Sequence, residues 1–395
     1  MSNKVFSLKN PNMAIKEFVR NYAMYAALAV IFIIFGIATG GRFLTARNLT
    51  NLINQTGYVA VMAVGMTVVL ILTQIDLSIG SIAGFFGAIA GLLLMKNVSF
   101  PLVILFLLIG GIIAGTLQGL VTGKLGVPAF VTTLAGLFIF RGFVMLTTES
   151  TGTIPVSNSF FNSISNGFLP ALFTIGGRHG LTILVGILAI IIPVITQINH
   201  RVEMKKYQFE VSSLPVFILK NLFFSILIGT VMFVLSGYRG ISWTIVVVAF
   251  VTAIYHIMLT KTKLGRHIYG VGGNKEAALL AGINVERIII FSFTSMGLMA
   301  ALGGILFTSR LQSATPTAGS GFELDTIAAC FIGGVSTSGG VGRVTNSVIG
   351  AFVIISLTNG LNLMTVGISY QYIIKGIIFI LAVAFDVRSR GKRLV

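Results

Sequence analysis

The residues best able to do chemistry are few in this chain and do not form a catalytic or metal-binding pattern. The four His are scattered, and the single Cys330 lies inside an apolar stretch, so neither a zinc site nor an intrachain disulfide is expected. The string GLVTGKL at 119–125 is the nearest approach to a phosphate-binding loop, but it lacks the leading spacing and the Ser or Thr that would face magnesium. We therefore expect no catalytic residue, no metal or other cofactor, and no ATP hydrolysis by this chain itself.

Charged residues inside or beside apolar segments are a second chemical signal, because a charge in hydrocarbon must be paired or must face water. Five carry the signal: Asp76, Arg141, Glu323, Asp325 and Lys375, whereas Lys220 is left out because its long side chain can reach the membrane surface. Two roles are open, because such residues can clamp helix ends together or contact a polar solute on its path. The clamp is the preferred interpretation.

A third signal is the polar stretch KTKLGRHIYGVGGNKEAALLAGINVER at 261–287, between two apolar segments. Asn274 is a favourable N-cap, Glu276 falls in the first turn where the helix dipole favours an anion, and Gly282 is suited to end a helix. The pattern predicts a helix of two turns. It carries small and larger apolar side chains: Ala277, Ala278, Ala281, Leu279, Leu280 and Ile283. Such a helix could dock in a groove of another protein, or it could be a linker lying on the membrane surface.

Membrane-spanning helices must position these residues. Of the 395 residues, 55% are hydrophobic and 9% are charged, which leaves too little polar surface to coat a soluble protein. Apolar runs of about 20 residues, the length that a helix needs to cross the bilayer, recur along the chain. About twelve spans are predicted, at 22–40, 57–75, 78–95, 101–122, 129–147, 180–197, 214–237, 241–259, 288–308, 324–341, 345–363 and 369–386. We expect one all-α polytopic domain covering 1–395.

Two of these spans are irregular. The span at 129–147 contains Arg141, and the span at 324–341 contains Asp325 and ends in the polar run GGVSTSGG. Either could be a broken or re-entrant helix, so the number of complete crossings is between ten and twelve.

The net charge of +17 is explained by where the basic residues lie. With the N-terminus inside, most Lys and Arg fall in cytoplasmic segments, as the positive-inside rule requires. These segments are 1–21, 198–213, 260–287 and 387–395. Both termini are therefore expected in the cytoplasm, and the charge does not indicate a nucleic-acid partner. Arg42 and Arg47 fall on the outer side and are the main exceptions.

An internal repeat is indicated, because the segment at about 54–147 resembles the segment at about 288–386. Three pairs of features match in the same order. The polar turn with Asp76 matches the turn with Glu323 and Asp325, QGL at 118–120 matches NGL at 359–361, and Arg141 matches Lys375. By span count the two copies start on opposite sides of the membrane, so the repeat is inverted, a plan common among transporters. Alternatively, helices rich in Gly and Ala resemble one another by composition alone.

Glycine is abundant, with 46 residues, although each glycine weakens a helix in water by about 1 kcal/mol relative to Ala. In lipid, small residues instead permit close contact between helices. Gly80, Gly84, Gly87 and Gly91 recur at spacings of three and four and are expected to pack against neighbouring helices.

Three long motifs resemble one known family. They are IDLSIGS at 75–81, GGNKEAALLAGINVER at 272–287 and TPTAGSGFELDTIAACFIGGVSTSGGVGRV at 315–344. All three are similar to the monosaccharide permeases of ATP-binding-cassette (ABC) importers, the ribose, galactose and xylose branch. The extended segment at 180–237 and the third motif resemble the xylose or multiple-monosaccharide type. The resemblance covers nearly the whole chain.

The resemblance implies a homodimeric pore in the bacterial cytoplasmic membrane, a cytoplasmic ABC ATPase and an extracytoplasmic sugar-binding protein. It also implies that the loop helix is the coupling helix to the ATPase, made of Asn274, Glu276, Ala277, Ala278, Leu280, Gly282 and Ile283. A sugar is neutral and rich in hydroxyls, so its path needs hydrogen-bonding side chains. The candidates for this path or for helix clamping are Asp76, Ser78, Gln118, Thr132, Arg141, Glu323, Asp325, Asn359, Gln371 and Lys375. A stand-alone secondary transporter or channel for a small polar solute is the alternative function.

Overall fold

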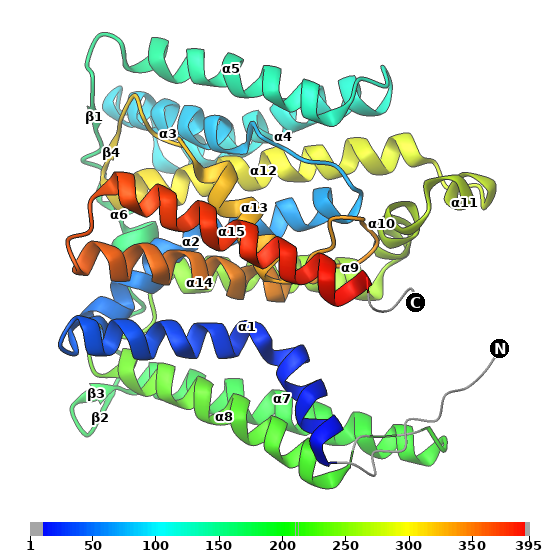
Figure 1. Ribbon diagram of the computed structural model, residues 1–395. Helices are drawn as coiled ribbons and strands as arrows, with labels where there is room; N and C mark the ends of the chain where they lie inside the picture. The colour runs from blue at the N-terminus through cyan, green and yellow to red at the C-terminus, as the bar shows by residue number, and fades with distance from the viewer. Residues whose placement is uncertain (1–10, 210, 212, 392–395) are drawn as a thin grey trace.

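The computed structural model describes residues 11–209, 211 and 213–391, and it is built almost entirely of helices (Figure 1). The long helices are α1 (Pro11–Ala38), α2 (Ala46–Ile71), α3 (Ile79–Met95), α4 (Phe100–Gly123), α5 (Ala129–Thr148), α7 (Gly180–Lys206), α8 (Leu214–Ser236), α9 (Trp243–Lys261), α12 (Val285–Leu311), α14 (Val344–Leu363) and α15 (Ile368–Gly391). The short elements are η1 (Arg42–Leu44), α6 (Ser159–Asn166), α10 (Lys263–Gly273), α11 (Lys275–Leu280), α13 (Phe322–Ile332), and the antiparallel strand pairs β1 (Ile154–Pro155) with β4 (Ser313–Ala314) and β2 (Thr174–Ile175) with β3 (Arg178–His179). The expected all-α polytopic fold is confirmed.

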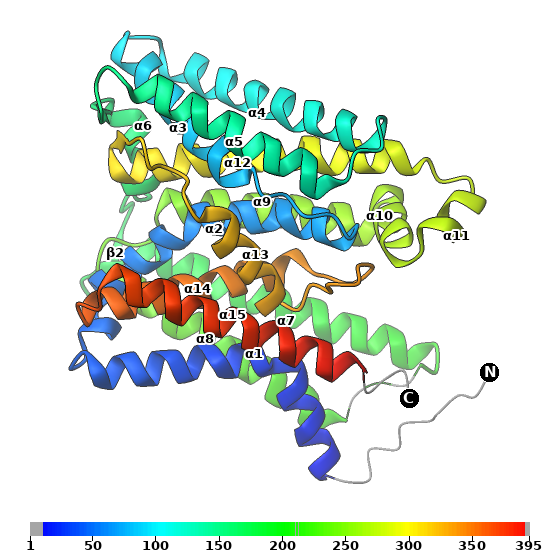
Figure 2. The same cartoon turned by 45° about the horizontal axis from the view of Figure 1, so that its top comes forward.

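The long helices run side by side, and their connections gather at two ends of the bundle (Figures 1 and 2). One end holds α10, α11, the start of α1 and the end of α15, and we call it the α11 end. The other holds α6 and the four strands, and we call it the α6 end. Of the predicted cytoplasmic segments, the described residues of 198–213 and all of 260–287 lie at the α11 end, so these basic stretches share one side of the bundle. Residues 1–10 and 392–395 lie outside the described residues.

Most predicted spans correspond to apolar helices. Within the described residues, eight helices are long and apolar enough to cross a membrane, and shorter apolar helices occur at Met24–Ala38, Ile79–Met95 and Ile368–Leu381. These helices account for every predicted span except 324–341. The span at 129–147 is the continuous helix α5, although it contains Arg141.

The prediction of a complete crossing at 324–341 is wrong, and the alternative of a broken helix describes this segment. Helix α13 has only 11 residues, a length of about 16 Å, which is half of the hydrocarbon thickness. It ends because Gly334 adopts a φ of 81° and its N–H donates to the carbonyl of Phe331, a helix end that glycine favours. The polar run that follows forms a loop at 333–343.

Two helix boundaries also differ from the prediction. Helix α2 begins at Ala46 rather than near residue 57, because the Thr45 side chain accepts from the backbone N–H of Asn48 and caps an earlier turn. Helix α7 runs to Lys206 and occupies much of the predicted loop at 198–213. Apolar length therefore located the membrane-crossing part of each helix but missed its polar extension.

The packing of the helices follows the predicted inverted repeat. Helix α12 packs on α4 and α3, and the corresponding helix of the first copy, α2, packs on α14 and α13. Helix α3 packs on α5 in the first copy, as α13 packs on α15 in the second. The first helix of each copy thus packs against the helices of the other copy, and α2 and α12 contact each other at the centre. Helices α7 and α8 form a hairpin at the edge, where Phe223 and Phe224 of α8 contact Tyr25 of α1 (Figure 1).

Glycine makes these contacts close, as expected. On α3, a Cβ at Gly87 would overlap the Thr308 hydroxyl, and a Cβ at Gly91 would lie 2.9 Å from Ile154 Cγ2. A close interface also lies between α4 and α12, where a Cβ at Gly115 would overlap the carbonyl oxygen of Phe293. Because a carbonyl in a packed helix cannot move aside as a side chain can, this interface requires glycine.

Replacing Gly115 with Ala tests this packing. We expect the variant to lose about 1 to 3 kcal/mol of stability, as overpacked interfaces do, and its apparent melting temperature in detergent to fall by several degrees. Gly142→Ala on α5 is the matched control, because a Cβ there meets nothing within 4 Å. Size-exclusion profiles after heating would measure both. Equal melting temperatures for the two variants would contradict the close α4–α12 contact.

Candidate functional site

A buried polar cluster lies where the chain turns between α2 and α3. Asp76 Oδ1 accepts from the backbone N–H of Ser78 at 2.8 Å and from its hydroxyl at 2.6 Å. The Ser78 hydroxyl also accepts from Gln118 Nε2 of α4 at 2.8 Å. Asp76, Ser78 and Gln118 are all buried. The carboxylate therefore supports the first turn of α3, which favours an anion, and the cluster ties this turn to α4.

The other uncharged candidates are also engaged within the protein. Asn359 accepts from Asn48 at 2.9 Å, and Gln371 donates to Asn362 at 2.8 Å and to the carbonyl of Val366 at 2.9 Å. Thr132 is buried, and its hydroxyl reaches only a carbonyl of its own helix, at 3.4 Å. The structure therefore places these side chains between helices, and it does not gather them around one cavity.

Charged candidates hold the short helix α13 in place. Lys375 of α15 forms an ion pair with Asp325 of α13 at 2.9 Å, and both side chains are about one-fifth exposed. Arg141 of α5 donates to the carbonyl of Ala318 at 3.0 Å, in the loop that precedes α13. Glu323 is half-buried near Gly80, at the first turn of α13. Arg141 and Lys375 correspond in the predicted repeat, and both fasten the α13 region from an outer helix.

At the α11 end, the loop at 261–287 folds into two helices rather than one. Helix α10 was not predicted, while α11 has the predicted cap, because Asn274 Oδ1 accepts from the N–H of Ala277 at 2.9 Å. Gly282 has a φ of 78° and its N–H donates to the carbonyl of Leu279, while the N–H of Ile283 donates to the carbonyl of Ala278. This pair of bonds is the glycine-dependent helix end that the sequence indicated.

The side chains of α11 divide between the chain's own interior and the exposed surface. Ala278 is buried against its own chain, so it is unavailable for the partner contact that the sequence suggested and serves to hold α11 in place. Glu276 and Ala277 are exposed. Leu280 is 91% exposed and Leu279 is 53% exposed at the tip of the helix. An apolar side chain this exposed, beyond the long helices, is suited to contact another protein.

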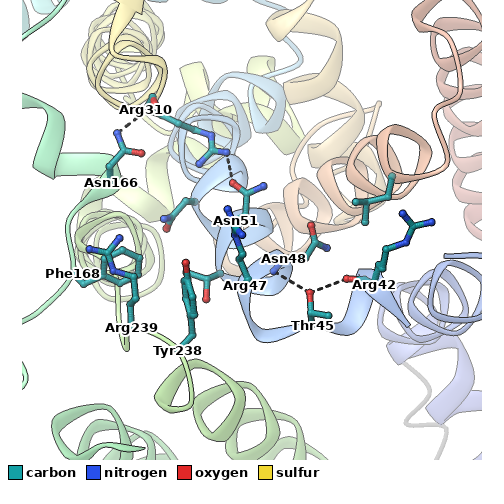
Figure 3. Close-up of a pocket in the computed structure, with 13 residues that line it drawn as sticks. Arg42, Thr45, Arg47, Asn48, Asn51, Asn166, Phe168, Tyr238, Arg239 and Arg310 are labelled. Carbon is teal, nitrogen blue, oxygen red and sulfur yellow. Dashed lines mark hydrogen bonds between the residues drawn. The ribbon is translucent and has the colours of Figure 1, made fainter. Parts of the chain in front are cut away.

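At the α6 end, a cavity of about 610 Å³ opens between segments that are distant in sequence (Figure 3). Four arginines border it: Arg42 after α1, Arg47 in the first turn of α2, Arg239 between α8 and α9, and Arg310 in the last turn of α12. Arg310 donates to Asn51 at 2.6 Å, and Asn166 donates to the carbonyl of Arg310 at 3.3 Å. The lining of the cavity also includes Thr45, Asn48, Thr50, Asn51, Asn54, Asn166, Phe168, Tyr238 and Leu363.

The charge of this cavity is unbalanced, because none of its described lining residues is Asp or Glu. Arg239 is held over the ring of Phe168 at 4.5 Å, and Arg42 donates to the carbonyl of Thr39. Arg310 lies in the last turn of α12, where a cation is favoured, but Arg47 stands in the first turn of α2, where the helix dipole disfavours it. Helix stability therefore does not explain Arg47. The cavity offers amides, guanidinium groups and a phenol in a positive potential.

The sequence did not predict this cavity, since none of the candidate path residues named from the sequence lines it. One signal was present. Arg42 and Arg47 broke the positive-inside pattern, and the structure places both at the same cavity. Basic residues that depart from the positive-inside rule can therefore indicate a functional site.

Comparison with known proteins identifies the family. Residues 48–383 match the family described as "Branched-chain amino acid transport system / permease component". The chain is 37% identical to the xylose transport system permease protein of Haemophilus influenzae, over 98% of this chain and 100% of that protein. It is 37% identical to the corresponding xylose protein of Escherichia coli, over 94% of this chain and 92% of that protein. It is 35% identical to the ribose import permease protein of Escherichia coli, over 87% of each chain.

No solved structure matches the chain significantly. The resemblance indicated by the three sequence motifs is confirmed by relatives that align over nearly the full length of both proteins. Because the family match covers most of the chain, this protein belongs to the permease components described as the branched-chain amino acid transport system family.

Proposed function

We propose that this chain is the membrane permease of an ABC importer that carries a monosaccharide into the cytoplasm. The observation that carries the proposal is the similarity to xylose permeases over nearly the whole of both chains. The exposed, capped helix α11 supports it, because a permease driven by a separate ATPase needs a docking element, whereas a stand-alone transporter or channel does not.

The chemistry of the α6-end cavity favours a sugar over an amino acid as the solute. A sugar is bound by side chains that donate and accept hydrogen bonds and by aromatic faces, and the asparagines, Tyr238 and Phe168 provide both. An amino acid also carries an ammonium group, which a carboxylate would normally pair. Since none of the described residues that line the cavity is Asp or Glu, we infer that the solute of this chain is not a branched-chain amino acid, although the family is described by that solute.

Uptake assays in cells that lack their own pentose importers test this function. We expect labelled xylose or ribose to accumulate when the permease is produced with its ATPase and binding protein, and labelled leucine not to accumulate. The control is the same strain without the ATPase gene, in which sugar uptake should be lost. Leucine uptake would overturn the sugar proposal, and sugar uptake without the ATPase would favour the stand-alone transporter.

The partner at the α11 end is a cytoplasmic ABC ATPase, in this proposal. The chain has no phosphate-binding loop of its own, so ATP hydrolysis belongs to that separate subunit. The contact is made by the exposed face of α11, with Leu280 at its centre and Glu276 and Ala277 beside it. Asn274, Ala278, Gly282 and Ile283 hold the helix in position. Two copies of the permease form the pore and present two such helices.

Replacing Leu280 with Asp tests the docking surface. Leu280 makes little contact within its own chain, so the permease should accumulate normally, while copurification of the ATPase should fall at least tenfold, because a charge would have to be buried at the contact. Leu125→Asp is the matched control, since Leu125 is 74% exposed in the α4–α5 connection at the same end. An equal loss in both variants, or in neither, would contradict docking through α11.

The partner at the α6 end is the extracytoplasmic sugar-binding protein. The four arginines give this end a positive potential that no acidic lining residue cancels, which suits a partner surface that carries carboxylates. The released sugar then enters the cavity beneath. Both proposals require the α6 end outside and the α11 end inside a bacterial cytoplasmic membrane, with both termini in the cytoplasm.

Single-cysteine labelling tests this orientation. A membrane-impermeant maleimide applied to intact spheroplasts should label Arg239→Cys and should label Lys275→Cys only after the membrane is opened, because both positions are exposed at opposite ends. The native Cys330 is fully buried and should stay unlabelled in both cases. Labelling of Lys275→Cys from outside would reverse the assignment of the two ends.

A further inference from the structure

Three backbone segments meet at the α11 end, where no motif predicted a contact. The last residue of α2, Ile71, offers a carbonyl that its own helix cannot use, and the N–H of Gly340 donates to it at 2.9 Å. Helix α10 reaches the same point through Gly272. The end of α2, the end of α10 and the loop at 333–343 thus share one contact, which we call the glycine junction.

At the junction, the backbone of Gly272 lies directly against the backbone of Ile71 and Gly340. A Cβ at Gly272 would overlap the Ile71 carbonyl oxygen and would lie 3.0 Å from the nitrogen of Gly340. Gly339 and Gly340 have φ angles of 77° and 68°, which glycine adopts most easily. A side chain can absorb a displacement by changing rotamer, but directly packed backbones cannot, so movement of one segment is passed to the others.

A second bond fastens α10 to the same loop. Tyr269 lies one turn before Gly272 on α10, and its hydroxyl donates to the carbonyl of Gly342 at 2.7 Å. Burial raises the pKa of the Tyr269 phenol, so the hydroxyl keeps its proton and remains a donor at neutral pH. Helix α10 therefore holds the loop at two points, near Gly340 and at Gly342.

The loop also has space beside it, where it faces α9 and α10. A cavity of about 660 Å³ borders Gly334, Gly340 and Gly342, together with Arg266 and Asn346. The loop is thus held firmly by α10 and α2 but is not packed on all sides. A segment with this arrangement can follow α10 when α10 moves.

The glycine junction lies between the docking loop and the two interrupted regions of the bundle. On one side, α10 continues through Asn274 into the exposed helix α11. On the other, α2 leads into the turn with Asp76 and then α3, while the loop leads back to the interrupted helix α13 with Asp325. The junction therefore joins the docking loop to the interrupted region of both copies of the repeat at once.

We propose that Gly272 and Tyr269 are positioning residues for transport, which convert displacement of α10 and α11 by the ATPase into simultaneous movement of α13 and of the α2–α3 turn. This inference rests on the proposed importer function. It assigns to α10, rather than to α11, the task of passing the motion on, whereas α11 only receives it.

The test uses the complete complex of permease, ATPase and binding protein in proteoliposomes, with labelled xylose or ribose, whichever the uptake assay identifies. Gly272→Ala adds one methyl group at the junction. Gly273→Ala is the matched control, because a Cβ at that neighbouring position meets nothing within 4 Å. Tyr269→Phe keeps the ring and removes only the bond to Gly342. The measurements are copurification of the ATPase, the rate of ATP hydrolysis, and sugar molecules transported per ATP.

We expect Gly272→Ala to retain the ATPase and its basal hydrolysis but to transport at least tenfold fewer sugars per ATP. The number of sugars per ATP in Tyr269→Phe should lie between that of Gly272→Ala and that of the wild type. Gly273→Ala should be near the wild type. A normal ratio in Gly272→Ala, or the same loss in Gly272→Ala and Gly273→Ala, would overturn the proposal. If Gly272→Ala fails to accumulate, an unchanged ratio in Tyr269→Phe overturns it. Failure of the importer function itself is distinguishable, because the wild-type complex would then transport no sugar.

Discussion

The structure depends on one constraint, that backbone N–H and C=O groups inside a bilayer must find partners within the protein. Among the described residues, the chain leaves regular helix inside the bundle at the α2–α3 turn and around α13, and both places hold buried residues, Asp76 and Ser78 at the first and Ala318 at the second. Asp76 accepts from the N–H of Ser78 at the first, and Arg141 donates to the carbonyl of Ala318 at the second. Charges that seemed costly in an apolar sequence are therefore what makes the interruptions possible.

The same constraint explains the glycines. Interrupted segments must lie against other parts of the protein rather than lipid. Glycine allows this, because without a side chain its backbone can lie directly against another backbone. Gly80 and Gly319 meet where α3 and the loop before α13 begin to pack, as Gly272 and Gly340 meet at the α11 end. At these two places backbone lies against backbone, and the contact cannot be adjusted by a change of rotamer.

The polar side chains fall into two groups, those that bond within the helix bundle and those that border the cavity at the α6 end. Polar side chains within the apolar spans, such as Gln118, Asn359 and Gln371, bond to other side chains or to the protein backbone. The polar side chains at the α6 end instead border an open cavity, together with four arginines. This arrangement suits a permease that takes its solute from a partner protein, because recognition can reside in that partner while the pore avoids holding the solute tightly.

The sequence alone determined the features that depend on neighbours in the chain. Apolar length located the spans, Asn274 and Gly282 defined the ends of α11, and the long motifs indicated the family. The tertiary structure decided what depends on distant segments: that Ala278 faces inward, that Lys375 pairs with Asp325, and that Arg42, Arg47, Arg239 and Arg310 border one cavity. A cap or an apolar run is settled within a few residues, whereas a cavity exists only when helices far apart in sequence stop at the same level. The glycine junction is of the second kind, because no local pattern reveals that Ile71, Gly272 and Gly340 meet.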